Sequence, residues 1–110
     1  MDAPLDPQAL QDVLTTRYVG RRAEFHAELG STNTRAIELA EAGAPDGTLV
    51  LAERQTAGRG RLGRRWHAPA GTSLLVSLVL RPALAPRGAQ RVTMICSLAA
   101  VEAIERLTGL

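Results

Sequence analysis

The sequence predicts a layered α/β or α+β domain in which helices flank a mixed sheet. Helix-like and strand-like segments follow one another in the order helix, strand, helix, strand, loop, strand, helix, without repeats or low-complexity linkers. The 110 residues, 45% of them hydrophobic, are enough for one modest core and too few for two domains. Three strands make a thin sheet, whose edges stay exposed unless further strands cover them.

A short helix and a strand are predicted at the start of the chain. Residues 7–18 predict the helix, with Asp6 as its N-cap and Pro7 at the first helical position, where a backbone N–H is not needed. Residues 23–29 alternate apolar and polar side chains, which is the pattern of a half-exposed strand. Gly30 then turns the chain.

The next helix and strand have clear local boundaries. Four residues with hydrogen-bonding side chains, 31–34, precede a helix predicted over 35–42, and Gly43 follows as its C-terminal stop. A turn at 45–47, made of Pro, Asp and Gly, leads into a strand predicted over 48–53. The helix therefore begins beside side chains that can bond to its backbone or to a ligand.

The second half of the chain predicts a loop, a strand and a helix. Residues 54–71 form a long Gly/Arg-rich loop, and loops of this length inside a compact domain are usually functional. Residues 74–80 are nearly all apolar and end at Arg81-Pro82, as expected for a central strand covered on both faces. Residues 89–107 predict a helix with apolar side chains round most of its surface, so we expect burial on most sides.

Basic and acidic residues are divided unevenly along the chain. Residues 1–53 hold four arginines and nine acidic residues, whereas residues 54–110 hold nine arginines and two acidic residues. No acidic residue lies between Glu53 and Glu102, so the eight arginines of that interval have no neighbouring carboxylate in the sequence. We expect their counter-charge to come from outside. All thirteen basic residues are arginine, and the chain contains no lysine.

Residues 58–66, with the sequence GRGRLGRRW, carry four of these arginines and three glycines. Glycine lets backbone N–H groups approach an oxygen-rich ligand, and arginine offers a planar fork of donors to carboxylate or phosphate. A solvated basic loop is the simpler alternative, but closely spaced glycines would then add disorder without structural gain. We therefore favour an anion-binding loop that closes over its ligand.

Two nucleotide-binding motifs are excluded for this segment. Residues 58–63 match G-x-G-x-x-G formally, but no helix is predicted directly after them and no acidic residue follows before Glu102. A Walker A loop needs a Gly-Lys-Ser/Thr sequence, which a chain without lysine cannot supply. The segment is therefore neither a dinucleotide fingerprint nor a P-loop.

Further candidate ligand-binding residues lie outside the arginine cluster. Ser31, Thr32 and Asn33 stand at a predicted helix start, where capping needs only one of them, and the sequence leaves capping and ligand contact equally open. Gln55 follows a strand and can reach the same ligand, although an isolated glutamine is more often a surface residue. Trp66, the only tryptophan, can fix the loop to the core or stack on a ring or on guanidinium planes, and the two roles are compatible.

Other reactive side chains show no functional pattern. His26 and His67 lack a partner pattern, and Cys96 lies among predicted core positions, so none of the three is expected to be catalytic. A single cysteine excludes a disulfide framework, and we expect no metal-ligand set. The sequence contains no apolar run of membrane-spanning length and does not begin like a signal peptide, so we expect a cytoplasmic protein without membrane contact.

The order of the motifs resembles one known family. Ser31-Thr32-Asn33 at a helix start, then a strand, then residues 55–66 with the sequence QTAGRGRLGRRW, then an apolar strand are similar to biotin protein ligase, the biotin–[acetyl-CoA-carboxylase] ligase family. The resemblance runs from about Glu28 to Leu107. It implies the class II aminoacyl-tRNA-synthetase-like catalytic domain of biotin and lipoate ligases, with residues 1–110 as its N-terminal portion.

The resemblance also implies a reaction and the residues that serve it. Biotin and MgATP give biotinyl-5′-AMP and pyrophosphate, and the acyl group then passes to a lysine on the biotin carboxyl carrier domain of acetyl-CoA carboxylase or another biotin-dependent carboxylase. Arg59 and Arg61 would stabilise the reacting charges, and Trp66 would anchor or close the loop. The implied substrate-binding set is Ser31, Thr32, Asn33, Gln55, Gly58, Arg59, Gly60, Arg61 and Trp66.

The chain departs from the family pattern in one respect. The family uses a lysine in a Lys-Trp-Pro-Asn-type segment that follows the helix corresponding to residues 89–107, and these 110 residues contain no lysine. We therefore expect little turnover from this chain alone. We also expect no N-terminal winged-helix DNA-binding domain, no C-terminal barrel-like domain, and room for a homodimer formed through open strand edges.

Two other functions stay open at this point. An isoelectric point of about 9.5 and the acid-free arginine region suit a basic nucleic-acid-binding module, although an aromatic content of 3% offers few stacking platforms. A catalytically silent interaction partner is a third hypothesis. Lipoate-type ligases share the reaction class, so biotin is indicated by the motif and not by physical argument.

Overall fold

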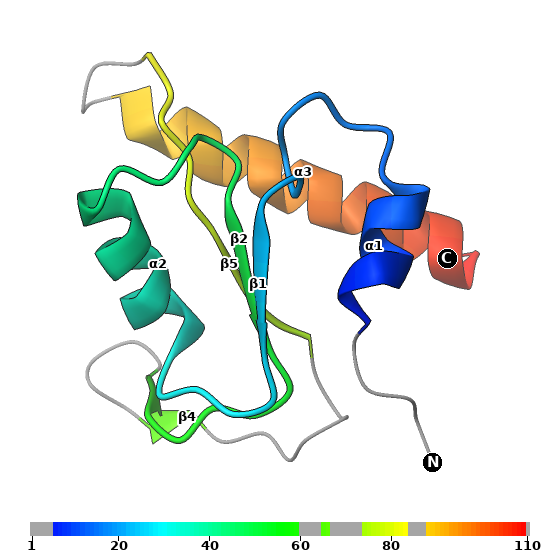
Figure 1. Cartoon of the computed structure of the whole chain (residues 1–110). Helices are drawn as coiled ribbons and strands as arrows, with labels where there is room; N and C mark the ends of the chain where they lie inside the picture. Colours follow the sequence, from blue (N-terminus) through cyan, green and yellow to red (C-terminus); the bar gives the residue numbers. More distant parts are fainter. Residues whose placement is uncertain (1–5, 60–64, 67–73, 84–87, 110) are drawn as a thin grey trace.

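Figure 1 shows the computed structural model of the chain, which describes residues 6–59, 65–66, 74–83 and 88–109. The predicted class, a mixed sheet flanked by helices, is confirmed, and so is the order of the predicted elements. The elements are α1 (Pro7–Val13), β1 (Ala23–His26), α2 (Thr32–Glu41), β2 (Leu49–Ala52), β3 (Gly58–Arg59), β4 (Arg65–Trp66), β5 (Leu75–Leu78) and α3 (Ala89–Thr108).

The main sheet has the strand order β1-β2-β5, with β1 and β2 parallel and β5 antiparallel to β2. The prediction that residues 74–80 form the central strand is wrong within the described sheet, because β5 lies at its edge and β2 lies in the middle. Val50 of β2 is fully buried, whereas Val76 of β5 is 40% exposed. An apolar run indicates burial, but it does not fix the position of a strand within a sheet.

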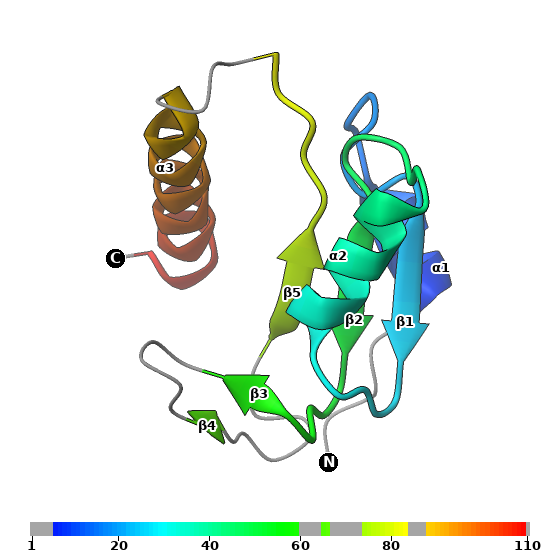
Figure 2. The same cartoon turned by 90° about the vertical axis from the view of Figure 1, so that its left-hand side faces the viewer.

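A second, two-stranded sheet interrupts the predicted loop over residues 54–71. Strands β3 and β4 pair antiparallel, with Gly58 opposite Trp66 and Arg59 opposite Arg65. The expectation of a loop without strands is therefore wrong for these four residues. Strands of two residues carry too few side chains to show an alternating pattern. Figures 1 and 2 place this small sheet at the same end of the main sheet as the N-terminus of α2.

The hydrophobic core lies between α2 and the main sheet. Ala36 and Leu39 of α2 are buried in one cluster with Val50 of β2, Ala44 and Val79. The helix begins at Thr32, three residues earlier than predicted, because Ser31 acts as its N-cap. Burial of this one face fixes α2 against the strands.

The C-terminus of α2 is closed as the sequence predicts. Gly43 has a φ of +89°, the left-handed conformation that glycine adopts without strain. The Arg81 side chain donates from Nε to the carbonyl oxygen of Ala44 (2.9 Å) and from Nη2 to that of Ala40 (2.8 Å). The guanidinium of Arg81 thus lies against carbonyl groups at a helix end, and an external counter-charge for it stays a prediction.

Helix α1 ends at Val13, five residues earlier than predicted. Its start follows the prediction, because Asp6 caps the helix and Pro7 occupies the first turn. After Val13 the chain becomes extended, and Arg21 donates to the carbonyl oxygens of Leu14 and Thr16 at 3.2 and 2.9 Å. These contacts replace a further helical turn.

Helix α3 stands beside the sheet, on the side where β5 is the edge strand (Figure 2). The expectation that it is buried on most sides is wrong, because none of its residues is buried. Cys96, predicted among core positions, is exposed. Large apolar side chains are exposed along the helix: Met94, Ile95, Leu98, Val101, Ile104 and Leu107. Within the described ranges, no helix combines the length and the hydropathy that a membrane span requires.

Candidate functional site

The candidate site is built from two loops that leave neighbouring parallel strands. The loop after β1 and the loop after β2 run side by side, with Leu29 bridged to Gln55 in parallel. Leu29 N donates to Arg54 O (3.0 Å), Thr56 N to Leu29 O (3.0 Å) and Ala57 N to Gly30 O (2.7 Å). Parallel strands end at the same edge of a sheet, so the helix start after β1 and Gln55 after β2 meet there.

Thr32 and Gln55 form the centre of the site. The Oε1 atom of Gln55 accepts from the backbone N–H of Thr32 (2.7 Å) and from its hydroxyl (3.1 Å). Thr32 is only 4% exposed, so the contact is shielded from water. The Nε2 atom of Gln55 carries two further donors, which its contacts with Thr32 do not use. They can therefore donate to a carbonyl or carboxylate group.

Ser77 is the third member of this group, and sequence reasoning missed it. Its hydroxyl lies 2.8 Å from the hydroxyl of Thr32. Because Gln55 Oε1 only accepts, the Thr32 hydroxyl hydrogen is directed at Gln55, and Ser77 donates to Thr32. A signal was present in the sequence, since Ser77 is the one polar residue in the apolar run 74–80.

Ser31 and Asn33 differ from Thr32 in their surroundings. The Ser31 side chain accepts from the backbone N–H of Thr34 at 3.4 Å, which is the capping role considered for the trio. Asn33 is exposed on the first turn of α2. The structure thus brings Thr32 and Gln55 together directly, while Ser31 and Asn33 lie on either side of Thr32 in the same turn.

The arginine-rich segment begins where the two tied loops end. Gly58 and Arg59 in β3 follow Ala57 directly, and the backbone of Trp66 in β4 pairs with Gly58. Gly60 and Arg61, both predicted to bind the substrate, lie outside the described residues. The backbone arrangement therefore places the start of the predicted anion-binding segment beside the Thr32–Gln55 pair.

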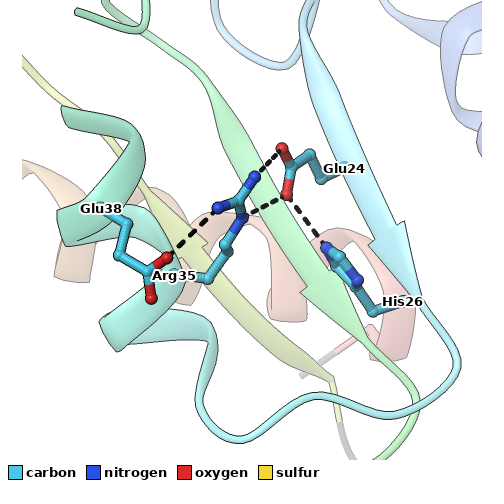
Figure 3. Close-up of polar contacts among 4 residues, drawn as sticks. All are labelled: Glu24, His26, Arg35 and Glu38. Carbon is cyan, nitrogen blue, oxygen red and sulfur yellow. Dashed lines mark hydrogen bonds and ion pairs between the residues drawn. The ribbon is translucent and has the colours of Figure 1, made fainter. Parts of the chain in front are cut away.

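A charged cluster links β1 to α2, and sequence reasoning did not identify it either. Arg35 of α2 donates from Nε and Nη2 to the two carboxylate oxygens of Glu24 in β1, both at 2.9 Å (Figure 3). His26 Nε2 lies 3.0 Å from the same carboxylate, and Arg35 also donates to Glu38 at 3.3 Å. The hydrogen bonds from Arg35 lower the pKa of Glu24 from 4.5 to about 2, against the opposing effect of partial burial.

The described residues also contain an ion pair next to Gln55 and an apolar hollow elsewhere in the fold. Arg54 Nη1 lies 3.9 Å from Glu28 Oε2, so the expected external counter-charge is wrong for Arg54. An apolar hollow of about 400 Å³ lies between β5 and α3, lined by residues that include Leu78, Ile95 and Cys96. It is separate from the Thr32–Gln55–Ser77 group. No cluster of three or more His, Cys, Asp or Glu side chains suited to a metal occurs in the part of the chain that the structure describes.

Known proteins are similar to this chain in sequence. The family model of the biotin/lipoate A/B protein ligase family matches residues 27–109. The bifunctional ligase/repressor BirA of Bacillus subtilis is 41% identical over 97 residues, which cover 88% of this chain and 30% of the relative. The biotin–[acetyl-CoA-carboxylase] ligase of Mycobacterium tuberculosis is 42% identical over 80 residues, which cover 71% of this chain and 30% of the relative. This chain therefore spans about 30% of the length of these relatives.

Two solved structures show the same fold. The biotin protein ligase from Aquifex aeolicus, in complex with biotin and ATP, aligns with a TM-score of 0.68 and 33% identity, over 82% of this chain and 37% of that one. The biotin protein ligase from Leishmania major, in complex with biotinyl-5-AMP, aligns with a TM-score of 0.63 and 31% identity, over 79% and 35%. The family match, the relatives and the shared fold agree: the chain belongs to the biotin/lipoate A/B protein ligase family.

Proposed function

We propose that this chain forms the biotin-binding part of the catalytic domain of a biotin protein ligase, which activates biotin with ATP to biotinyl-5′-AMP and transfers it to a lysine of a carrier protein. The observation that carries the proposal is the Thr32–Gln55–Ser77 group, set directly beside the start of the arginine-rich segment. The names of the relatives and the ligands of the structural neighbours support it.

The residues of the group suit a ligand with a polar head and an apolar body. Biotin carries a ureido ring, whose carbonyl accepts and whose two N–H groups donate hydrogen bonds. The Nε2 donors of Gln55 and the hydroxyl of Ser31 offer complementary partners, Thr32 would act by holding Gln55, and Asn33 lies in the same helical turn. Small-molecule sites commonly combine an apolar wall with a few convergent polar groups of this kind.

The arginine-rich segment suits the chemistry of the first step. A biotin carboxylate oxygen bonds to the α-phosphorus of ATP, and the bond to the departing pyrophosphate breaks. Both reactants are anions, so Arg59 and Arg61 would offset their repulsion and the charge on the phosphoryl oxygens, with Gly58 and Gly60 allowing close backbone approach. Mg²⁺ would enter with the nucleotide. Trp66 would anchor or close the segment and exclude water from the mixed anhydride.

The second step needs a partner protein. A lysine amine of a biotin carboxyl carrier domain attacks the acyl carbonyl of biotinyl-5′-AMP, the amide forms, AMP leaves and the amine loses a proton. We place this reaction in the cytoplasm and propose a homodimer formed through open strand edges. We further propose that these 110 residues alone give little turnover, because they contain no lysine and span about 30% of their relatives.

The experiment that tests the proposal is a titration of the full chain with biotinyl-5′-AMP, compared with a double variant, Arg59→Gln with Arg61→Gln. The double variant should bind at least about 100-fold more weakly, because each lost charge-assisted contact costs about 1.5 to 3 kcal/mol. The control variant Arg91→Gln removes the same type of charge from the exposed start of α3 and should bind as the parent does.

Two outcomes would contradict the proposal. One is unchanged affinity of the double variant for biotinyl-5′-AMP. The other is preference for a random oligonucleotide over biotinyl-5′-AMP, with binding that falls steeply as salt is raised, as expected when phosphate contacts dominate. The latter result would favour the basic nucleic-acid-binding module.

A further inference from the structure

The charged cluster between β1 and α2 centres on a partly buried ion pair, Glu24 and Arg35. Arg35 meets both oxygens of Glu24 at 2.9 Å, and the two side chains are only 34% and 29% exposed. Isolated ion pairs on a surface contribute little to stability. A bidentate arginine–carboxylate pair, however, also fixes the orientation of the two side chains relative to each other. The remaining contacts, from His26 to Glu24 and from Arg35 to Glu38, hold the pair from both sides (Figure 3).

We propose that Glu24 and Arg35 are a positioning pair for the ligand site: they hold the first turn of α2 against β1 and thereby set Thr32 against Gln55 and Ser77. The inference rests on the proposed function, because the ligand whose affinity depends on this geometry is biotin. Neither residue needs to touch the ligand to have this effect.

The backbone connects Arg35 directly to the site. Arg35 N donates to Ser31 O at 3.1 Å, and this bond closes the first turn of α2 around Thr32. The hydrogen bonds between Glu24 and Arg35 therefore tie together the two ends of the segment 24–35, and Thr32 is part of that segment. A shift of Arg35 away from β1 carries the Thr32 N–H and hydroxyl with it.

The first turn of α2 is then held by all three strands of the main sheet. Glu24 acts from β1 through Arg35, Gln55 acts from the end of β2, and Ser77 acts from β5. Of these three contacts, only the Glu24–Arg35 pair lies outside the proposed ligand site. A substitution there can therefore remove one contact without altering the site itself. Because Glu24 has a lowered pKa of about 2, the pair is charged throughout the neutral pH range.

The test compares Glu24→Gln, Arg35→Gln and the charge-swapped double variant Glu24→Arg with Arg35→Glu, all in the full chain. Biotin affinity is measured by calorimetry at a temperature where every variant is folded. We expect each single variant to bind biotin about tenfold more weakly, which is the loss expected when about one hydrogen bond to the ligand is weakened. We expect the swap to recover part of the loss. The control Glu102→Gln breaks an exposed pair in α3 of comparable length, 2.7 Å, and should change nothing.

A double-mutant comparison separates positioning from general stability. With Thr32→Val present, Glu24→Gln should cause no further loss of biotin affinity, because its effect passes through Thr32. Additive losses, or unchanged affinity of Glu24→Gln, would overturn the inference.

A measurement without ligand decides the matter independently of the proposed function. Amide hydrogen exchange of Thr32 should become about tenfold faster in Glu24→Gln, whereas exchange of Val50 in the central strand should not change. Unchanged exchange at Thr32 would refute the positioning role. Failure of the parent chain to bind biotin would refute the proposed function and leave the positioning role to the exchange data.

Discussion

The carboxamide oxygen of Gln55 lies 2.7 Å from the backbone nitrogen of Thr32, although 23 residues separate the two in the sequence. One side chain thus satisfies a free N–H at the start of α2 from outside the helix, and its own N–H donors take no part in that contact. If Gln55 also binds the ligand, as proposed above, one amide has a structural role and a recognition role, and substitutions can separate the two.

Gln55→Glu should separate them. The carboxylate retains the acceptor for both Thr32 contacts and suits a helix N-terminus, but the substitution removes the two N–H donors of Nε2. We expect a melting temperature within about 3 °C of the parent and biotin affinity reduced at least about tenfold. Gln55→Ala should lose both stability and affinity, because the Thr32 N–H then lacks its acceptor. Calorimetry and thermal unfolding measure the two effects, and a Glu variant that binds like the parent would refute the recognition role.

Ser77→Ala removes a residue that sequence reasoning did not select. The hydroxyl of Thr32, which is 4% exposed, loses the hydrogen bond from Ser77 and keeps the one to Gln55, so we expect the free energy of unfolding to fall by about 1 kcal/mol. Biotin should bind a few-fold more weakly, because Thr32 then lacks the contact that ties it to β5. Ser97→Ala on exposed α3 is the matched control for urea denaturation and should lie within about 0.5 kcal/mol of the parent.

Gly47 and Gly43 allow a test of backbone strain against steric clash. Both have a left-handed φ, +88° and +89°. A Cβ at Gly47 would lie 2.7 Å from Tyr18 Cδ2 and 2.8 Å from Tyr18 O, whereas a Cβ at Gly43 meets nothing within 4 Å. We expect Gly43→Ala to cost about 1 kcal/mol of unfolding free energy and Gly47→Ala about 3 kcal/mol or more. Equal losses in urea denaturation would show that Tyr18 moves away from the added Cβ at little cost in free energy.

The Glu24–Arg35 pair predicts a pH window for stability. The pKa of Glu24 falls from 4.5 to about 2 on folding, so its contribution is present above pH 4.5 and is lost as the pH falls towards 2. The melting temperature of the parent should therefore exceed that of Glu24→Gln at pH 7, and the difference should shrink between pH 4.5 and 2. Glu102→Gln, whose pair is exposed, serves as the comparison. A difference that stays constant down to pH 2 would contradict the lowered pKa.

Local features of the fold were predictable from the sequence. Asp6 and Pro7 at α1, Ser31 among the hydrogen-bonding residues before α2 and Gly43 after it lie where nearest-neighbour chemistry places them. Such caps depend on a few consecutive residues, so periodicity and turn residues are enough to find them.

The features that were missed depend on distant partners. Ser77 meets Thr32 across 45 residues, and Glu24 meets Arg35 across 11, between a strand and a helix. The apolar run that forms β5 indicated burial, but its place at an edge of the described sheet depends on which strands pair. Likewise, the apolar surface of α3 gave no information on whether other elements lie against it.

The ties between the two loops fix their lengths jointly. Leu29 and Gly30 are matched to Arg54, Thr56 and Ala57 by successive backbone bonds. One residue inserted into either loop would shift these partners out of register. The start of α2 would then move away from the start of the arginine-rich segment. Anyone who transplants this pair of loops into another scaffold must therefore move both loops together, at their native lengths, or move neither.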